Sequence, residues 1–223
     1  MRIKLFGEEH QNTANCYFNL GETQRKHGDL KEALQSYQHA LDIRIKLFGE
    51  EHQSTADCYF SLGVTQHEQG DLKEALQSYK HALDIRIKLS GEEHQSTADC
   101  YFSLGVTQHE QGDLKEAFQY FQHALDIRII LFGEEHQTTA NCYFNVGAIQ
   151  GKQGDLKEAL QCFQHALDIR IKLFGEEHQR TAECYRLLSK AQFRLGDFKA
   201  ARQSRQRERD IRNKLSGEHQ STA

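Results

Sequence analysis

The sequence predicts an all-α solenoid built from stacked antiparallel helix pairs, with about ten full helices in 223 residues. Three observations support this fold class. A glycine returns every 42 residues from Gly7 to Gly217, and a histidine follows each of the first five glycines by three residues. Residues 50–91 and 92–133 match at 36 of 42 positions. A period of about 20–50 residues is typical of arrays in which each repeat buries its apolar face against its neighbours.

Each repeat is predicted to contain two helices. Helix A spans residues 54–69 in the second repeat, where apolar residues recur at intervals of three and four and Gly70 ends the run. Helix B follows Asp71, which stands at an N-cap position with Glu74 three residues later, as in a capping box. It runs about 19 residues to Gly91, and a short polar segment leads to the next repeat.

The period divides the chain into five repeats within one predicted solenoid domain, 1–223. Residues 1–7 belong to a partial B helix and residues 218–223 to the start of a further A helix. The repeats themselves cover approximately 8–49, 50–91, 92–133, 134–175 and 176–217.

Composition and cysteine spacing predict a soluble cytoplasmic protein. No apolar run approaches the roughly 18 residues that a membrane helix needs, so no membrane partner is expected. The N-terminus has no apolar stretch of a secretory signal. Five of the six cysteines recur every 42 residues, unlike the irregular spacing of disulfide frameworks, and are predicted to be small buried side chains. These are Cys16, Cys58, Cys100, Cys142 and Cys184, while Cys162 stands apart.

Nothing in the sequence indicates catalysis, and we expect no enzyme activity and no cofactor. Phosphate-binding loops, dinucleotide-binding glycine motifs and nucleophile elbows are all missing. The thirteen histidines fall mostly into two series with one member per repeat, too far apart to share zinc, so no metal site is expected. The loop series that begins at His10 is predicted to cap helix ends or to touch the adjacent repeat.

The repeat carries a recognisable pattern of small and aromatic residues. With Ala14 counted as position 1, these residues occupy positions 4, 7, 8, 15, 20, 24 and 27 of the first repeat: Tyr17, Leu20, Gly21, Gly28, Ala33, Tyr37 and Ala40. This pattern resembles the tetratricopeptide repeat, and the eight additional residues resemble the 42-residue variety of kinesin light chains and nephrocystin-3-like proteins. The resemblance implies a right-handed superhelix. Two departures are Gln24 at position 11, where Tyr is usual, and Gln53, where Pro is expected.

The resemblance also implies a concave groove, lined by the A helices, that binds a peptide or helix of a partner protein. Phenylalanine at position 5 would supply aromatic anchors. The alternative is that this ring turns inward and packs helix A against helix B. The groove candidates are Phe18, Asn19, Phe60, Ser61, Val64, Phe102, Ser103, Val106, Phe144 and Asn145.

Two ligand modes of the family match this chain poorly. The carboxylate clamp needs groove cations where this chain has Phe and Val. Acidic tryptophan-containing peptides, as bound by kinesin light chains, need basic groove residues, which occur here only near Arg25, Lys152 and Lys190. The sequence therefore predicts a non-catalytic interaction scaffold with an unidentified protein partner. Because the repeats vary little, the alternative is a structural spacer or a solenoid that self-associates end to end within a larger multidomain protein.

Charge is distributed unevenly along the chain. Residues 1–179 hold 17 Lys and Arg against 27 Asp and Glu, so the array would repel phosphate and no nucleic acid is expected to bind. Residues 180–223 hold 11 against 5. In this degenerate fifth repeat Arg205 replaces the helix B aromatic and Glu208 the second alanine, which predicts a solvating C-terminal cap. The alternative is a basic patch that attracts an acidic partner.

Overall fold

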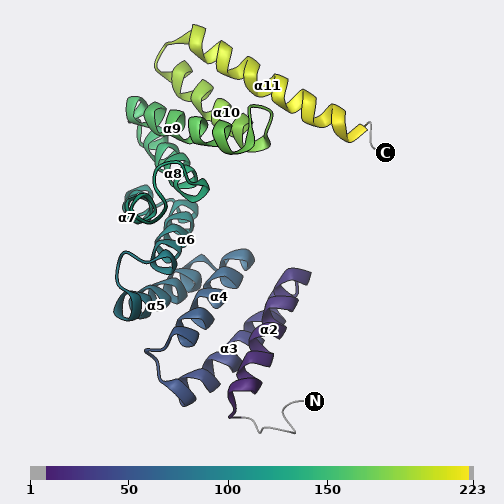
Figure 1. The fold of residues 1–223 in the computed structure, drawn as a ribbon, viewed down its shortest axis with the longest axis vertical. Helices are drawn as coiled ribbons and strands as arrows, with labels where there is room; N and C mark the ends of the chain where they lie inside the picture. Colours follow the sequence, from purple (N-terminus) through teal and green to yellow (C-terminus); the bar gives the residue numbers. More distant parts are fainter. Residues whose placement is uncertain (1–8, 221–223) are drawn as a thin grey trace. The chain divides into compact units, whose positions relative to one another are not determined.

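In a computed structural model of the chain, which describes residues 9–220, ten helices follow one another and no strand occurs (Figure 1). The predicted all-α class is confirmed. The first helix of each repeat is α2 (Gln11–His27), α4 (Gln53–Gln69), α6 (Gln95–Gln111), α8 (Gln137–Gln153) or α10 (Gln179–Arg194). The second is α3 (Leu30–Phe48), α5 (Leu72–Ser90), α7 (Leu114–Phe132), α9 (Leu156–Phe174) or α11 (Phe198–Gln220).

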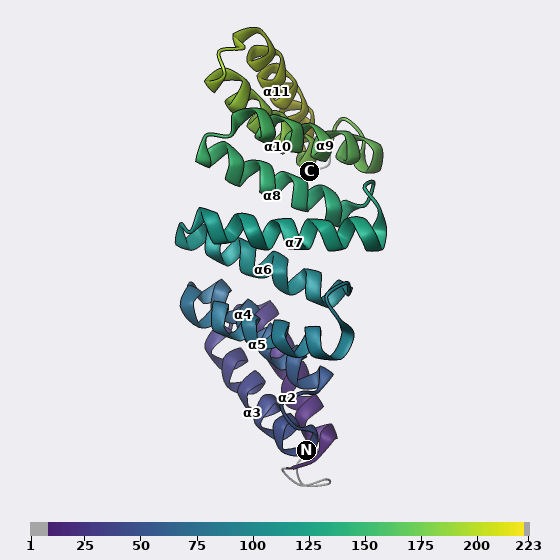
Figure 2. The ribbon, with the colours of Figure 1, turned by 90° about the vertical axis from the view of Figure 1, so that its left-hand side faces the viewer.

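The helices form two compact units, residues 1–113 and residues 114–223. Within each unit, consecutive antiparallel helices pack as a solenoid. In the first unit, α3 packs on α2 and on the following α4; in the second, α9 packs on α8 and on the following α10. Figure 2 shows α7 and α8 lying side by side in the same way. A single domain over 1–223 and a right-handed superhelix stay predictions.

The core of each unit lies between successive repeats. Ala33, Tyr37 and Ala40 of α3 are fully buried and share one cluster with Cys58 and Leu62 of α4. In the second unit the corresponding cluster joins α9 to α10. Small residues let the helices approach closely, and larger ones fill the remaining space. Part of the apolar surface of each repeat is therefore buried against its neighbour, as the period predicts.

The prediction for the repeating cysteines is confirmed for four of them. Cys58, Cys100, Cys142 and Cys184 are buried, Cys16 is half-buried, and all are free thiols. Burial raises the thiol pKa of Cys58 to about 11, because the charged thiolate loses its hydration. These cysteines act as small core residues.

The predicted capping box at the start of helix B is wrong. Asp71 makes no side-chain cap bond and has φ −79° and ψ 63°, the values of an inverse γ-turn. The N–H of Leu72 donates to the carbonyl of Gly70 at 2.9 Å, which closes that turn. A capping side chain needs an extended backbone, so the tight connection takes the place of the cap. Gly70 itself is left-handed, with φ 90°, and ends α4.

Loop histidines cap the A helices, as predicted. The Nδ1 atom of His52 accepts a hydrogen bond from the N–H of Ser54 at 3.2 Å, and four other histidines repeat this contact. Thr55 completes the junction by donating to the carbonyl of Gly49 at 3.0 Å. Gly49 ends α3 with φ 85° and ψ 176°, a conformation restricted in practice to glycine.

The partial repeats predicted at the two chain ends can be compared with the structure only where residues are described. The partial helix expected at 1–7 lies outside the described residues, and so do residues 221–223. The prediction that a new A helix starts at residue 218 is wrong for residues 218–220, because α11 continues to Gln220. Earlier B helices stop at a glycine whose carbonyl binds a threonine of the next A helix. The equivalent Thr222 lies outside the described residues.

Candidate binding face of the A helices

The groove candidates lie along one stripe of each A helix. In α4 this stripe, here called the A-helix face, contains Asp57, Phe60, Ser61 and Val64, spaced as one side of a helix. All four residues are half-buried, and α6 repeats the arrangement with Phe102, Ser103 and Val106. Asn19 of α2 is exposed, whereas Phe18 in the first unit and Phe144 and Asn145 in the second are half-buried.

Each position-5 ring is partly exposed and also packs against helix B of the same repeat. Phe60 lies 5.5 Å from Tyr79 of α5, measured between ring centroids, and the guanidinium of Arg86 stacks 4.5 Å above its ring. Phe18 makes the same pair of contacts with Tyr37 and Arg44. Each ring therefore also holds helix A against helix B, and removing it would disturb more than a binding surface.

The arginine that stacks on each ring was not predicted from the sequence. Arg44 of α3 is 7% exposed and donates to the carbonyl of Ser54 at 2.8 Å and to Sγ of Cys58 at 3.2 Å, both in α4. Its other terminal nitrogen donates to Oδ1 of Asn15 in α2 at 3.3 Å. One side chain thus joins three helices of two repeats. The signal was the arginine that recurs every 42 residues between two isoleucines at the end of helix B.

This set of contacts, in which one helix B arginine binds the A helices on either side of it, is here called the arginine clamp. It recurs in both units. Arg86 binds Ser96 and Cys100 of α6 and pairs with Asp57 of α4 at 3.2 Å. In the second unit Arg170 of α9 binds α10 in the same way. A buried guanidinium is costly unless its donors are paired, so these hydrogen bonds fix how successive A helices sit in each unit.

The polar candidates differ in whether their side chains are already engaged. Asn145 donates to the carbonyl of Asn141 in its own helix at 2.9 Å, and Ser103 lies near enough to the Tyr79 hydroxyl to lower its pKa against the larger rise that burial causes. The side chains of Asn19 and Ser61 have no hydrogen-bond partner among residues 9–216. These two groups are therefore available to a ligand.

Charged pairs connect the A helices near their C-terminal ends. In the first unit Arg25 of α2 donates to Glu68 of α4 at 2.7 Å, and Nε2 of His67 lies 3.0 Å from the carboxylate of Glu110 in α6. Glu68 and Glu110 stay 38% and 48% exposed. Carboxylates thus flank the A-helix face of the first unit where the stripe of Ser61 and Val64 ends.

The described side chains assemble no metal-binding group. Within residues 9–216, no group of three or more His, Cys, Asp and Glu side chains could hold a metal ion. None of the helices in that range is long and apolar enough to span a bilayer. What the described surface offers is shape, hydrogen-bonding groups and charge.

A family model for the tetratricopeptide repeat matches residues 1–46, 28–88, 67–129, 111–172 and 145–214, nearly the whole chain. The chain belongs to the tetratricopeptide repeat family. The resemblance inferred from positions 4 to 27 is confirmed, and kinesin light chain-like repeat proteins are among its structural neighbours. A comparison with curated proteins gives no significant match.

Solved tetratricopeptide-type structures resemble this repeat array closely in fold. BtubC (BKLC) from P. vanneervenii superposes with a TM-score of 0.82 at 23% identity, covering 93% of this chain and 82% of that one. A putative kinesin light chain of nearly identical repeats from Podosopora anserina gives 0.78 at 19% identity, with 92% and 98% covered. The apo form of RapI gives 0.81 at 19% identity, with 93% and 73% covered. At such identities the likeness concerns the fold alone.

Proposed function

We propose that this tetratricopeptide repeat chain is a non-catalytic interaction scaffold whose A-helix face binds an extended peptide of a partner protein. The observation that carries this proposal is the stripe of Ser61, Val64 and Val106 on the neighbouring helices α4 and α6. Val64 and Val106 are half-buried apolar side chains, and the Ser61 hydroxyl is unused within the described residues. Such a stripe offers apolar contact beside a hydrogen-bonding group, which is what peptide sites combine.

The charge of the first unit indicates which peptide fits. Residues 1–113 carry 11 Lys and Arg against 18 Asp and Glu. Glu68 and Glu110 are exposed beside the stripe, whereas Arg44 and Arg86 are buried beneath it. Complementary charge speeds encounter and selects the partner. The proposed ligand is therefore a segment with an apolar side chain flanked by Lys or Arg.

A peptide-display screen of the wild-type chain against the double variant Val64→Lys, Val106→Lys tests this function. Lysine at position 9 is compatible with the fold, because Lys190 occupies that position in α10. The change removes apolar contact and repels a basic ligand, so we expect enriched peptides to lose binding by at least about tenfold. Replacing Phe60 would be a poorer test, because its ring also packs on Tyr79 and Arg86 and its loss would disturb the fold as well as the binding surface.

The matched control is Gln35→Lys, Gln77→Lys, which adds the same charge on exposed positions of α3 and α5. It should retain every enriched peptide. Equal loss in both variants would indicate general electrostatics, and a folded chain that enriches nothing would refute the groove. The second candidate, a structural spacer, would then be favoured by the 36 of 42 matching positions between two repeats.

A further inference from the structure

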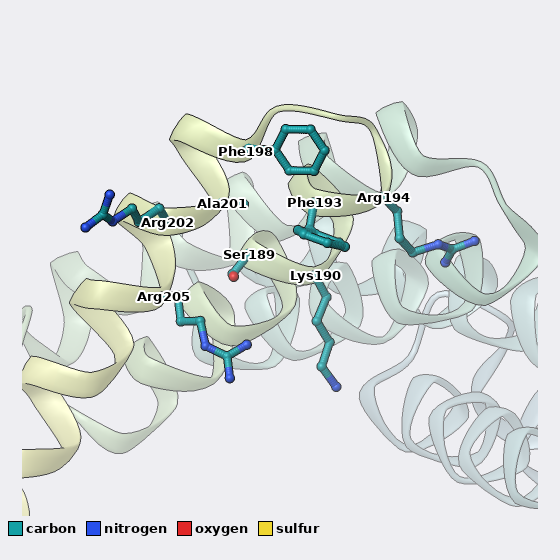
Figure 3. A pocket seen from close by; sticks show the side chains of 8 residues that line it. All are labelled: Ser189, Lys190, Phe193, Arg194, Phe198, Ala201, Arg202 and Arg205. Atoms are coloured by element: carbon teal, nitrogen blue, oxygen red, sulfur yellow. The ribbon is translucent and has the colours of Figure 1, made fainter.

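An open apolar pocket of about 540 Å³ lies between α10 and α11. Figure 3 shows the rings of Phe193 and Phe198 together at one end, with the charged ends of Lys190 and Arg205 extending on the other side. The two rings meet edge to face at 5.3 Å between centroids. The remaining lining residues are Ser189, Arg194, Ala201 and Arg202.

In the first helix pair, a helix covers the corresponding surface. Ala201 and Arg205 occupy the places of Ala33 and Tyr37, which are fully buried against Cys58 and Leu62 of α4. Position 12, held by Phe193 in the last pair, is held in the first by Arg25, which binds Glu68 of α4. This surface of a helix pair is therefore shaped to receive a helix that carries small and apolar residues on one side and a carboxylate beside them.

The last pair leaves this surface open among the described residues. Phe193 and Phe198 are 62% and 63% exposed. Helix α11 continues to Gln220, past the glycine at which the earlier B helices end and the chain turns toward the next A helix. No helix within residues 9–220 covers the pocket.

Cations replace the residues that complete this surface elsewhere. Arg202 stands where α3 has Leu34, Arg205 where it has Tyr37, and Lys190 where α4 has Val64. Lys190, Arg202 and Arg205 form no ion pair within residues 9–216, and no carboxylate lines the pocket. A cap that only kept the array soluble would not need two exposed phenylalanines. The apolar floor formed by Phe193, Phe198 and Ala201 and the cationic rim of Lys190, Arg202 and Arg205 therefore indicate a binding surface.

We propose that this pocket is the docking site for an acidic amphipathic helix of a partner protein. Its apolar face would cover Phe193, Phe198 and Ala201, and its Glu or Asp side chains would pair with Lys190, Arg202 and Arg205. The α2 helix of a second copy is a poorer occupant. Its Leu20 is 46% exposed, yet its last turn carries Arg25, Lys26 and His27, which would face the cationic rim.

Two labelled peptides that differ only in flanking charge test the proposal on the full chain. Both carry the sequence of residues 53–69, the helix that covers the corresponding surface of the first pair, with Cys58→Ala. One has Glu and the other Lys in place of Gln53, Gln66 and Gln69. By fluorescence anisotropy, we expect the Glu peptide to bind at least about tenfold more tightly, with affinity falling as salt rises.

Two single variants place the site on α11. Arg205→Glu should weaken the Glu peptide at least about tenfold, because it reverses a rim charge. Arg207→Glu makes the same change beside Glu176 and Tyr185, away from the pocket, and should stay within about twofold. Circular dichroism confirms that both variants are folded. Equal binding of the two peptides, equal loss in the two variants, or no binding would overturn the proposal.

Two further measurements separate this site from the other possibilities. The double variant Val64→Lys, Val106→Lys should bind the Glu peptide like wild type, because the pocket does not rest on the A-helix face of the first unit. Light scattering of the free chain should give a monomer mass. A dimer that Arg205→Glu dissolves would show that a second copy occupies the pocket and would refute a partner helix.

Discussion

At the scale of single residues, glutamine at position 11 shows how side-chain pairs replace the usual family pattern. Gln66 of α4 accepts a hydrogen bond from the hydroxyl of Ser78 in α5 at 2.7 Å, and two other repeats form the same bond. In the fourth repeat Cys162 replaces the serine, and Oε1 of Gln150 is buried without a partner. A buried acceptor without a donor costs free energy.

Restoring that donor should stabilise the protein. Cys162→Ser gives Gln150 the hydroxyl that its counterparts bind, and we expect about 1 kcal/mol of added stability, or about 2–4 °C in Tm. Thermal unfolding followed by circular dichroism measures the change. The reverse variant Ser78→Cys should lower Tm, and an unchanged Tm in both would show that the pair contributes nothing.

Glycine at position 8 is required for a close helix contact. A Cβ atom added at Gly63 would lie 2.8 Å from ring atoms of Tyr79, so Gly63→Ala should destabilise by about 1–3 kcal/mol. Gly151 lies in an equally helical segment, but its added Cβ would meet only Ala159 at 3.8 Å. Gly151→Ala should therefore be neutral or stabilising. Urea unfolding compares the two, and equal costs would contradict the packing explanation.

At the scale of helices, the two types of helix begin by different means. The A helices start at a histidine whose Nδ1 accepts a backbone hydrogen bond, whereas α3, α5 and α9 start without a side-chain cap. Helix α11 is an exception, because Oδ1 of Asp197 accepts from the N–H of Ala200 at 3.0 Å. His52 also stacks on Phe48 at 4.5 Å between ring centroids. His94 has the same cap bond, but Ser90 stands in place of the phenylalanine. His52 and His94 of the first unit therefore differ in whether the cap has this aromatic neighbour.

This pair of caps gives a graded prediction. His94→Ala should cost about 1 kcal/mol, the usual value of an N-cap. His52→Ala should cost about 0.5–1.5 kcal/mol more, because the stacked ring is lost as well. Urea unfolding measures both variants. His52→Asn, which keeps a capping acceptor, should recover part of the loss; equal costs at the two sites would show that stacking adds nothing.

At the scale of the molecule, stability rests on one repeated interface. The arginine clamp, the Tyr37 cluster and the threonine–glycine bond each link one repeat to the next. Cys58, Cys100 and Cys184 are buried at this interface, and Cys162 of α9 is half-buried apart from it. Burial raises the thiol pKa of all four to about 11. The nearby guanidinium lowers the pKa of Cys58 only in part, because burial dominates. The folded state therefore holds these thiols protonated.

Alkaline pH should consequently destabilise the whole array. In the unfolded chain these thiols lose their protons near pH 9, whereas the folded chain keeps them to about pH 11. The stabilisation is complete below about pH 9 and is lost as pH rises toward 11. Urea midpoints at pH 7.5, 9 and 10.5 should fall in that order. A variant with all four cysteines changed to alanine should show a weaker fall, and an identical one would contradict this cause.

The period, the glycines that end helices within the array and the histidine caps could be predicted from the sequence, because they depend on contacts between residues close along the chain. Gly70 ends α4 through its own left-handed backbone conformation. Nδ1 of His52 accepts a hydrogen bond from the N–H of Ser54, two residues along the chain. The capping box at Asp71 was predicted wrongly because Asp and Glu at the right spacing do not reveal the backbone angles of a tight turn.

By itself, the sequence determined that this protein is an all-helical array of 42-residue repeats. Only the tertiary structure decided that the position-5 rings are half-buried under Arg44 and Arg86, and that the last pair keeps an apolar pocket with a cationic rim. The reason is physical. Periodicity records which residues share a helix face, but exposure depends on what the neighbouring repeat places against that face.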